Sequence, residues 1–122
     1  MAELKYMELN LMQIYDVLRS ARLLRLAVCS RGQPYVVPMA YQLEVTGGQT
    51  VLHLASPDTG RKLDALDANS CFSAELEQSG CAWLDTVIID GTASVRAAEE
   101  HGVEILLRAE TMSGRRYFLP AE

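Results

Sequence analysis

The sequence predicts a mainly β protein, a small closed or nearly closed antiparallel barrel with short helices at its ends. Three observations lead to this fold class. About five or six short segments have the composition and patterning of strands, glycine-containing turns separate several of them, and helical periodicity is confined to short stretches. The chain has 122 residues, which suits one core, so we expect residues 1–122 to form a single domain.

The composition is that of a globular, acidic protein. Hydrophobic residues make up 49% and charged residues 22%, which argues against a disordered chain, and the net charge of −5 argues against a nucleic-acid partner. Three cysteines without a CxxC pair, and only two histidines, argue against a disulfide framework or a zinc site. We find no apolar run of the roughly 20 residues that span a membrane, and no signal-like N-terminus, so we expect a cytoplasmic protein without a membrane partner.

The first elements follow from periodicity and turn residues. Apolar side chains recur at three- and four-residue steps from Leu4 to Leu18, which predicts an amphipathic helix. Strand patterning then predicts three strands in an antiparallel meander, separated by turns at 31–34 and 46–49. These three expected strands are residues 23–30, about 35–45 and 50–56.

The second of these strands is apolar on both faces. Alternation sends one set of side chains to each side, namely Tyr35, Val37, Met39 and Tyr41 against Val36, Pro38 and Ala40. A barrel interior covers only one face, so the other requires a different cover. Pro38 also lacks the N–H that a ladder hydrogen bond requires.

The remaining elements continue the pattern. A short helix is expected to begin with Ser56 as N-cap and Pro57 at its first position, to pack through Leu63 and Leu66, and to end near Asn69. The later expected elements are strands at 71–78 and about 83–95, a helix at 97–109 and a short final strand at 115–120.

The segment 56–66, SPDTGRKLDAL, carries the clearest chemical signal. Arg61 and Lys62 lie near a helix start, where cations oppose the helix dipole unless an anion sits among them. Gly60 permits close approach to the backbone, and an arginine fork beside a lysine suits a phosphate. Two alternatives remain open: both cations lie in water, or Arg61 pairs with a nearby aspartate such as Asp58 or Asp64.

Three segments in this order resemble the FMN-binding split-barrel family: PYVVPMAY, HLASPDTGRKLDAL and LDTVIIDGTASV. This is the pyridoxamine 5′-phosphate oxidase-like group, which includes the nitroimidazole-resistance-like flavoproteins. The similarity spans about residues 17–95. It implies a split β-barrel that forms a homodimer with FMN in clefts at the interface, where partner and flavin cover the second apolar face.

The resemblance also assigns cofactor-binding residues. The basic pair, with Gly60 and Ser56, maps onto the phosphate site, the stretch 37–41 onto the segment lining the flavin ring, and 86–88 onto the strand at the ring edge. The expected residues are Val37, Pro38, Met39, Ala40, Tyr41, Ser56, Gly60, Arg61, Lys62, Thr86, Val87 and Ile88. Tyr41 is equally interpretable as a dimer-core aromatic, Met39 as core packing and Thr86 as an ordinary strand residue.

The resemblance implies a flavin-dependent oxidoreductase, nitroreductase-like or pyridoxamine 5′-phosphate oxidase-like, that takes a small-molecule electron donor or acceptor. Many relatives have a histidine before the serine of the phosphate motif, whereas this chain has Ala55 there and His53 two residues earlier. No residue stands out as a general acid or base, so no catalytic side chain is named. The alternatives are a non-enzymatic flavin carrier or sensor, and a haem-binding split barrel with His53 or His101 as ligand.

Overall fold

The computed structural model describes residues 5–120, and in this part of the chain an antiparallel sheet of eight strands carries two helices. The elements are β1 (Lys5–Glu8), α1 (Leu11–Ser20), β2 (Leu23–Ser30), β3 (Gln33–Ala40), β4 (Gln42–Thr46), β5 (Gln49–Ser56), α2 (Arg61–Ala68), β6 (Cys71–Ser79), β7 (Trp83–Ala97) and β8 (Val103–Phe118). The mainly β fold class is therefore confirmed.

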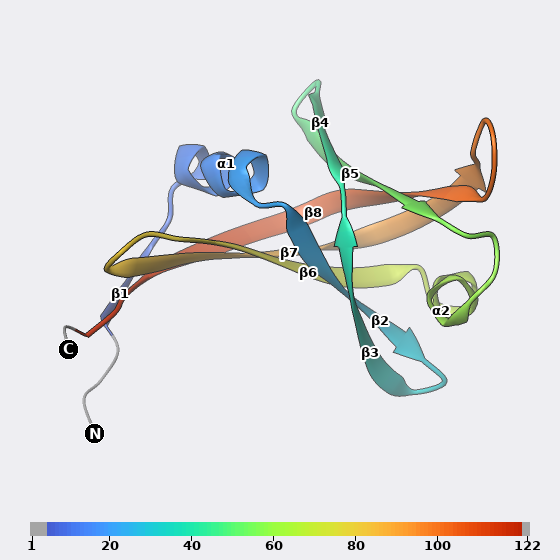
Figure 1. Ribbon diagram of the computed structural model, residues 1–122, viewed down its shortest axis with the longest axis horizontal. Coiled ribbons are helices and arrows are strands. Elements are labelled where there is room, and N and C mark those ends of the chain that lie inside the picture. The colour runs from blue at the N-terminus through green and yellow to red at the C-terminus, as the bar shows by residue number, and fades with distance from the viewer. Residues whose placement is uncertain (1–4, 121–122) are drawn as a thin grey trace.

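The sheet closes through the junction between β3 and β4. The strand order is β3-β2-β6-β7-β8-β5-β4, and β1 pairs with β8. β3 and β4 stand at opposite ends of this order, yet only Tyr41 separates them in sequence. In Figure 1 the chain that runs from β3 through Tyr41 into β4 crosses the long strands β6, β7 and β8. The expected single strand at 35–45 is thus two strands, one paired with β2 and one with β5, and the sheet forms a split barrel.

β3 is an edge strand with two different faces. Val37 and Met39 pack against the core, whereas Val36 is 57% exposed. Pro34 and Pro38 stand four residues apart, so their nitrogens point to the same side of the strand. Since β3 pairs only with β2, that side is the unpaired edge, where a missing N–H costs no ladder bond.

The N-terminal segment differs from the expected single helix. Residues 5–8 form β1 instead, which pairs with the end of β8, and Leu4 lies outside the described residues. α1 begins only after Asn10, whose side chain accepts a hydrogen bond from the backbone N–H of Gln13, while the Gln13 side chain accepts one from the N–H of Asn10. This capping box sets the helix start.

The segment 97–109 is also not the expected helix. β7 continues to Ala97, a turn ending at Gly102 reverses the chain, and β8 begins at Val103. β8 is bonded on both sides here, to β7 and to β5, and Ile105 and Leu107 are fully buried. Pairing with two neighbours outweighs local helical periodicity, and the expected strand at 115–120 is the end of this same long strand.

Candidate functional site

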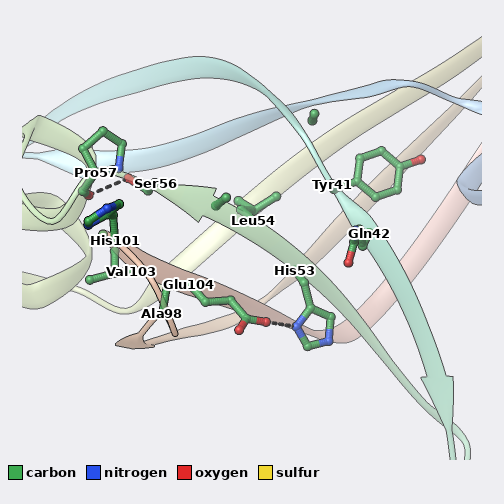
Figure 2. Close-up of a pocket in the computed structure, with 13 residues that line it drawn as sticks. Tyr41, Gln42, His53, Leu54, Ser56, Pro57, Ala98, His101, Val103 and Glu104 are labelled. Carbon is green, nitrogen blue, oxygen red and sulfur yellow. Dashed lines mark hydrogen bonds and ion pairs between the residues drawn. The ribbon is translucent and has the colours of Figure 1, made fainter.

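A pocket of about 900 Å³ opens beside the β3–β4 junction. Its walls are residues 40–42 of that junction, residues 53–57 at the end of β5 and residues 101–104 around the start of β8, which Figure 2 shows facing one space. The β7–β8 turn packs closely on the end of β5, since a Cβ on Gly102 would lie 2.4 Å from the carbonyl oxygen of Ser56. The pocket has the size of a cofactor or small-molecule site.

Tyr41 forms one wall of this pocket. Its hydroxyl donates to carbonyl oxygens at the end of α1, at 2.5 Å from that of Leu18 and 3.0 Å from that of Ala21. Burial raises the pKa of this hydroxyl. The hydroxyl is therefore committed to fixing α1 against the barrel, and the ring is the part of Tyr41 that remains for a ligand.

α2 starts four residues after the pocket wall, later than the sequence predicts. The expected capping by Ser56 is wrong, because its hydroxyl is buried and donates to the carbonyl oxygen of Pro57 at 2.9 Å. Gly60 is the N-cap, at φ 137°, and provides no side-chain acceptor. The first amides of α2 therefore have no capping oxygen, which leaves the positive end of the helix dipole open to an anion. The expected end of the helix, at Asn69, is confirmed.

Arg61 is held in place by the β2–β3 hairpin. Its Nε donates to the hydroxyl of Ser30 at 2.9 Å, and its guanidinium carbon lies 4.1 Å from the ring centre of Tyr35. Among residues 5–120, the ion pairs include neither Arg61 nor Lys62, so the alternative of a pair with an aspartate is not formed. The two terminal guanidinium nitrogens thus remain for a phosphate, in a side chain that is already oriented.

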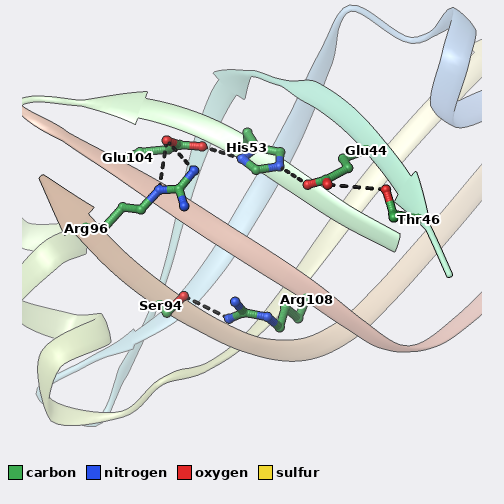
Figure 3. Close-up of polar contacts among 7 residues, drawn as sticks. All are labelled: Glu44, Thr46, His53, Ser94, Arg96, Glu104 and Arg108. Carbon is green, nitrogen blue, oxygen red and sulfur yellow. Dashed lines mark hydrogen bonds and ion pairs between the residues drawn. The ribbon is translucent and has the colours of Figure 1, made fainter. Parts of the chain in front are cut away.

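A chain of charged side chains crosses four neighbouring strands at the other end of the pocket, as Figure 3 shows. His53 on β5 bonds Glu44 on β4 through Nε2, at 2.6 Å, and Glu104 on β8 through Nδ1. Arg96 on β7 donates to the second oxygen of Glu104 at 3.1 Å. The bond to Glu44 chiefly raises the pKa of His53, and His53 in turn lowers the pKa values of both carboxyls.

The two carboxylates favour the imidazolium form of His53, in which both ring N–H groups donate to carboxylates. Two negative and two positive charges balance within the cluster of Glu44, His53, Glu104 and Arg96. Both ring nitrogens of His53 are therefore engaged, and neither is free to ligate a metal.

The other expected cofactor residues fall in different places. Ala40, Tyr41 and Ser56 line the pocket, whereas the side chains of Val37 and Met39 face the core. Thr86 and Ile88 line a separate hollow, with residues 113–115 of β8. Nine residues of β8 separate Glu104 at the pocket from Ser113 at that hollow, or about 30 Å of strand.

Val87 lies between Thr86 and Ile88 but points the opposite way. Its side chain is fully buried among the core residues. Only the main chain of Val87 is therefore available to a cofactor.

Several residues that hold the candidate site residues in place were not found from the sequence. Ser30 and Tyr35 orient Arg61 from a hairpin about 30 residues earlier, and Glu44 and Glu104 bracket His53 from neighbouring strands. None of these lies within a helical turn of its partner, so no local spacing signals the contact. Only correct strand pairing would have revealed them.

Two absences apply to the part of the chain that the structure describes. Residues 5–120 contain no helix with the length and apolar content of a membrane span. The same residues contain no group of three or more histidine, cysteine, aspartate or glutamate side chains placed to hold a metal ion.

Comparison with solved structures shows the same fold in several proteins. A FAD-binding protein from Mesorhizobium loti is 24% identical, with a TM-score of 0.79 over 91% of this chain and 97% of that one. A proposed 5-nitroimidazole antibiotic resistance protein from Bacteroides thetaiotaomicron is 14% identical, with a TM-score of 0.75 over 95% and 90% of the two chains. The FAD-binding protein from Mycobacterium smegmatis is 18% identical, with a TM-score of 0.71 over 92% and 98%. No curated protein matches the chain significantly.

A match to a family profile assigns the chain to a family. The profile described as pyridoxamine 5′-phosphate oxidase matches residues 12–117, which includes both helices, the pocket and nearly the whole sheet. The resemblance drawn from the three sequence segments is thereby confirmed. The chain belongs to the pyridoxamine 5′-phosphate oxidase family.

Proposed function

We propose that this protein binds FMN, with the phosphate at the start of α2 and the flavin ring in the pocket beside the β3–β4 junction. The proposal depends on one observation, namely that the Arg61 side chain is oriented but has no anionic partner within residues 5–120. It is oriented by Ser30 and Tyr35, has no carboxylate partner among the described residues, and stands at a helix start without a side-chain cap. Such a cation is stabilised by a bound anion.

The pocket has a lining suited to the isoalloxazine ring of FMN. It adjoins α2 through residues 56 and 57, and its lining includes the ring of Tyr41 and the apolar side chains of Leu54, Pro57 and Val103. A planar aromatic ring buries its faces against such groups while its polar atoms require hydrogen bonds. The structural neighbours named as FAD-binding support a flavin and leave the larger dinucleotide as the competing ligand.

We propose further that the protein is a homodimer in which two copies complete each flavin site. Thr86 and Ile88 line a separate hollow, nine positions along β8 from the pocket, so we propose that they contact the flavin of a second copy. Ile88 is 42% exposed and Val36 is 57% exposed in one copy. Burial of these side chains against a partner would cover the second apolar face of the sheet.

The chemistry that bound FMN would supply is hydride or electron transfer, which makes a flavin-dependent oxidoreductase the proposed activity. The residues of this chain would bind the phosphate, hold the ring against Tyr41 and exclude water from one of its faces. A haem-binding alternative through His53 is disfavoured, because both ring nitrogens of His53 are bonded to carboxylates.

The absorption spectrum of the purified protein is the first test. A flavin spectrum, with FMN released on denaturation, supports the proposal, whereas a haem Soret band contradicts it. Apoprotein is then titrated with FMN, FAD and riboflavin. Because the basic residues at α2 matter only for a phosphate, FMN should bind more tightly than riboflavin, and equal affinities would remove the phosphate site.

Activity requires a separate test. Reduction of the bound flavin by NADH or NADPH, followed by turnover of a nitroaromatic acceptor, would establish an oxidoreductase. Tight flavin binding without reduction or turnover would instead establish a carrier or sensor.

A further inference from the structure

Four titratable side chains line the pocket: Tyr41, His53, His101 and Glu104. Three of them are already committed to other protein groups. The hydroxyl of Tyr41 donates to the main chain at the end of α1, and His53 and Glu104 belong to the balanced charge cluster. Tyr41 and His53 therefore cannot donate a hydrogen bond to a bound molecule without breaking an existing one, and Glu104 can only accept.

His101 differs from the other three. The sequence suggested a surface residue of a helix, but the structure places it in the β7–β8 turn, where it lines the pocket beside Pro57. Figure 2 shows its ring near Ser56 and Pro57, on the side of the pocket that leads to α2, with no hydrogen bond to the other residues drawn. Its ring nitrogens thus remain available for a ligand.

The turn that carries His101 is fixed to the pocket wall. The backbone N–H of Ala98 donates to the carbonyl oxygen of Gly102 at 3.2 Å, and Gly102 packs against the main chain of Ser56. The position of His101 relative to the end of β5 is therefore defined by main-chain contacts on both sides of the residue.

We propose that His101 is the ligand-contacting hydrogen-bond donor of this pocket and that it donates to a polar atom of the bound flavin. The proposal rests on the proposed flavin site and adds to it the residue that recognises the ligand on this side. Imidazoles change charge between about pH 5 and 8, so a protonated His101 would add the one cation of the pocket lining that no protein carboxylate bonds.

Other charges act on His101 as well. Glu99 and Glu100 share its turn, and Asp58 follows Pro57 in the chain; all three are exposed. On the far side, His53, Glu104, Glu44 and Arg96 are paired among themselves. The exposed carboxylates are screened by solvent, so they do not replace a direct hydrogen bond to the ligand.

The experiment compares the wild-type protein with His101→Gln and with the matched control Glu100→Gln. Dissociation constants for FMN are measured by fluorescence quenching at pH 5.5 and pH 8. The second proton of the FMN phosphate titrates near pH 6, but this affects both proteins equally and cancels in the ratio of variant to wild type. His101→Gln should bind FMN about tenfold more weakly at pH 5.5 and about threefold more weakly or less at pH 8, because a charge-assisted hydrogen bond is stronger than a neutral one.

A spectroscopic readout accompanies the titration. The chain has two histidines, so its NMR spectrum contains two imidazole Hε1 signals, and His101→Gln assigns them. Addition of FMN should move the His101 signal, and more strongly at pH 5.5 than at pH 8.

Three results would overturn the inference. The first is an equal FMN affinity of His101→Gln and wild type at both pH values, the second an unmoved His101 signal in the FMN complex, and the third an equal loss of affinity in Glu100→Gln, which would show that the turn merely needs its charge or shape. If the wild-type protein itself fails to bind FMN, the proposed function is refuted. If the wild-type protein binds FMN and His101→Gln binds it with the same affinity, only the proposed role of His101 is refuted.

Discussion

Replacement of Arg61 by alanine tests the phosphate site directly. The two terminal guanidinium nitrogens of Arg61 are the groups offered to FMN, and a hydrogen bond between charged partners contributes about 1.5–3 kcal/mol. Arg61→Ala should therefore weaken FMN binding by roughly 10- to 150-fold. Riboflavin, which lacks the phosphate, should bind the variant and the wild type equally.

The same substitution has a calculable effect on the apoprotein. It removes the hydrogen bond to Ser30 and the contact with the Tyr35 ring, each about 0.5–1 kcal/mol at an exposed site. It also removes a cation from a helix N-terminus, which returns about 0.3–1 kcal/mol. The sum is a loss of up to about 1.5 kcal/mol, so the variant should remain folded. From the helix dipole alone, removal of this cation predicts an unchanged or slightly raised stability, and the contacts to Ser30 and Tyr35 change that expectation.

The assay is a pair of titrations and a melting curve for each of three variants. Arg61→Lys keeps the charge but loses the fork, so it should recover part of the FMN affinity. Lys62→Ala should cost less than Arg61→Ala, because the structure gives Lys62 no hydrogen bond or ion pair that would orient it. Equal losses of FMN and riboflavin affinity in Arg61→Ala would refute a phosphate contact and would indicate a general distortion of the site.

Three further predictions test other parts of the structure. Because folding raises the pKa of His53, this residue stabilises the fold at pH values below its ordinary pKa of 6.5, and the stabilisation is lost as the pH rises through the raised pKa. Because folding lowers the pKa values of Glu44 and Glu104, these residues stabilise the fold above their ordinary pKa of 4.5. The melting temperature of wild type should therefore exceed that of His53→Gln most between about pH 4.5 and 6.5 and less at pH 9; a difference independent of pH would contradict the charge cluster. Gly91→Ala should lower stability by about 2–4 kcal/mol in denaturant unfolding, because its Cβ would lie 1.9 Å from the carbonyl oxygen of Arg108; Ser94→Ala on the same strand is the control, and an equal effect of both would refute a steric cause. Light scattering at micromolar concentration should give the mass of a dimer, and a monomer mass would refute the proposed interface.

Local patterns predicted the parts of the fold that local chemistry determines. The alternation in 71–78 correctly placed Phe72, Ala74 and Leu76 in the core, because β6 has one buried and one open face. The hairpin turn at Gly47 and Gly48 was also predictable, because a two-residue turn between twisted strands requires positive φ, which glycine adopts readily. Both residues have positive φ, at 59° and 79°.

The errors occurred where distant pairing determines the local structure. Residues 5–8 and 103–109 have apolar spacings that a helix would also satisfy. Residues 5–8 are a strand because they pair with β8, and residues 103–109 are a strand because this part of β8 pairs with β5 and β7. The site shows the same division. Arg61 was identifiable from its position near a helix start, but the contacts that orient it come from Ser30 and Tyr35, and only the β2–β3 pairing brings that hairpin to α2.

A net charge of −5 is compatible with an anionic ligand because the charges are arranged locally. At physiological salt an exposed charge acts over about 8 Å, so the groups around the site matter more than the total. At one end of the pocket, His53 and Arg96 offset the carboxylates of Glu44 and Glu104. At the start of α2, Arg61 is held by a hydroxyl and an aromatic ring, neither of which neutralises it. In the proposed site, a phosphate would be directed to α2 because Arg61 is oriented but not paired with any described carboxylate. A variant that gives Arg61 a carboxylate partner, Ser30→Asp, should therefore abolish selectivity for FMN over riboflavin while leaving the fold intact.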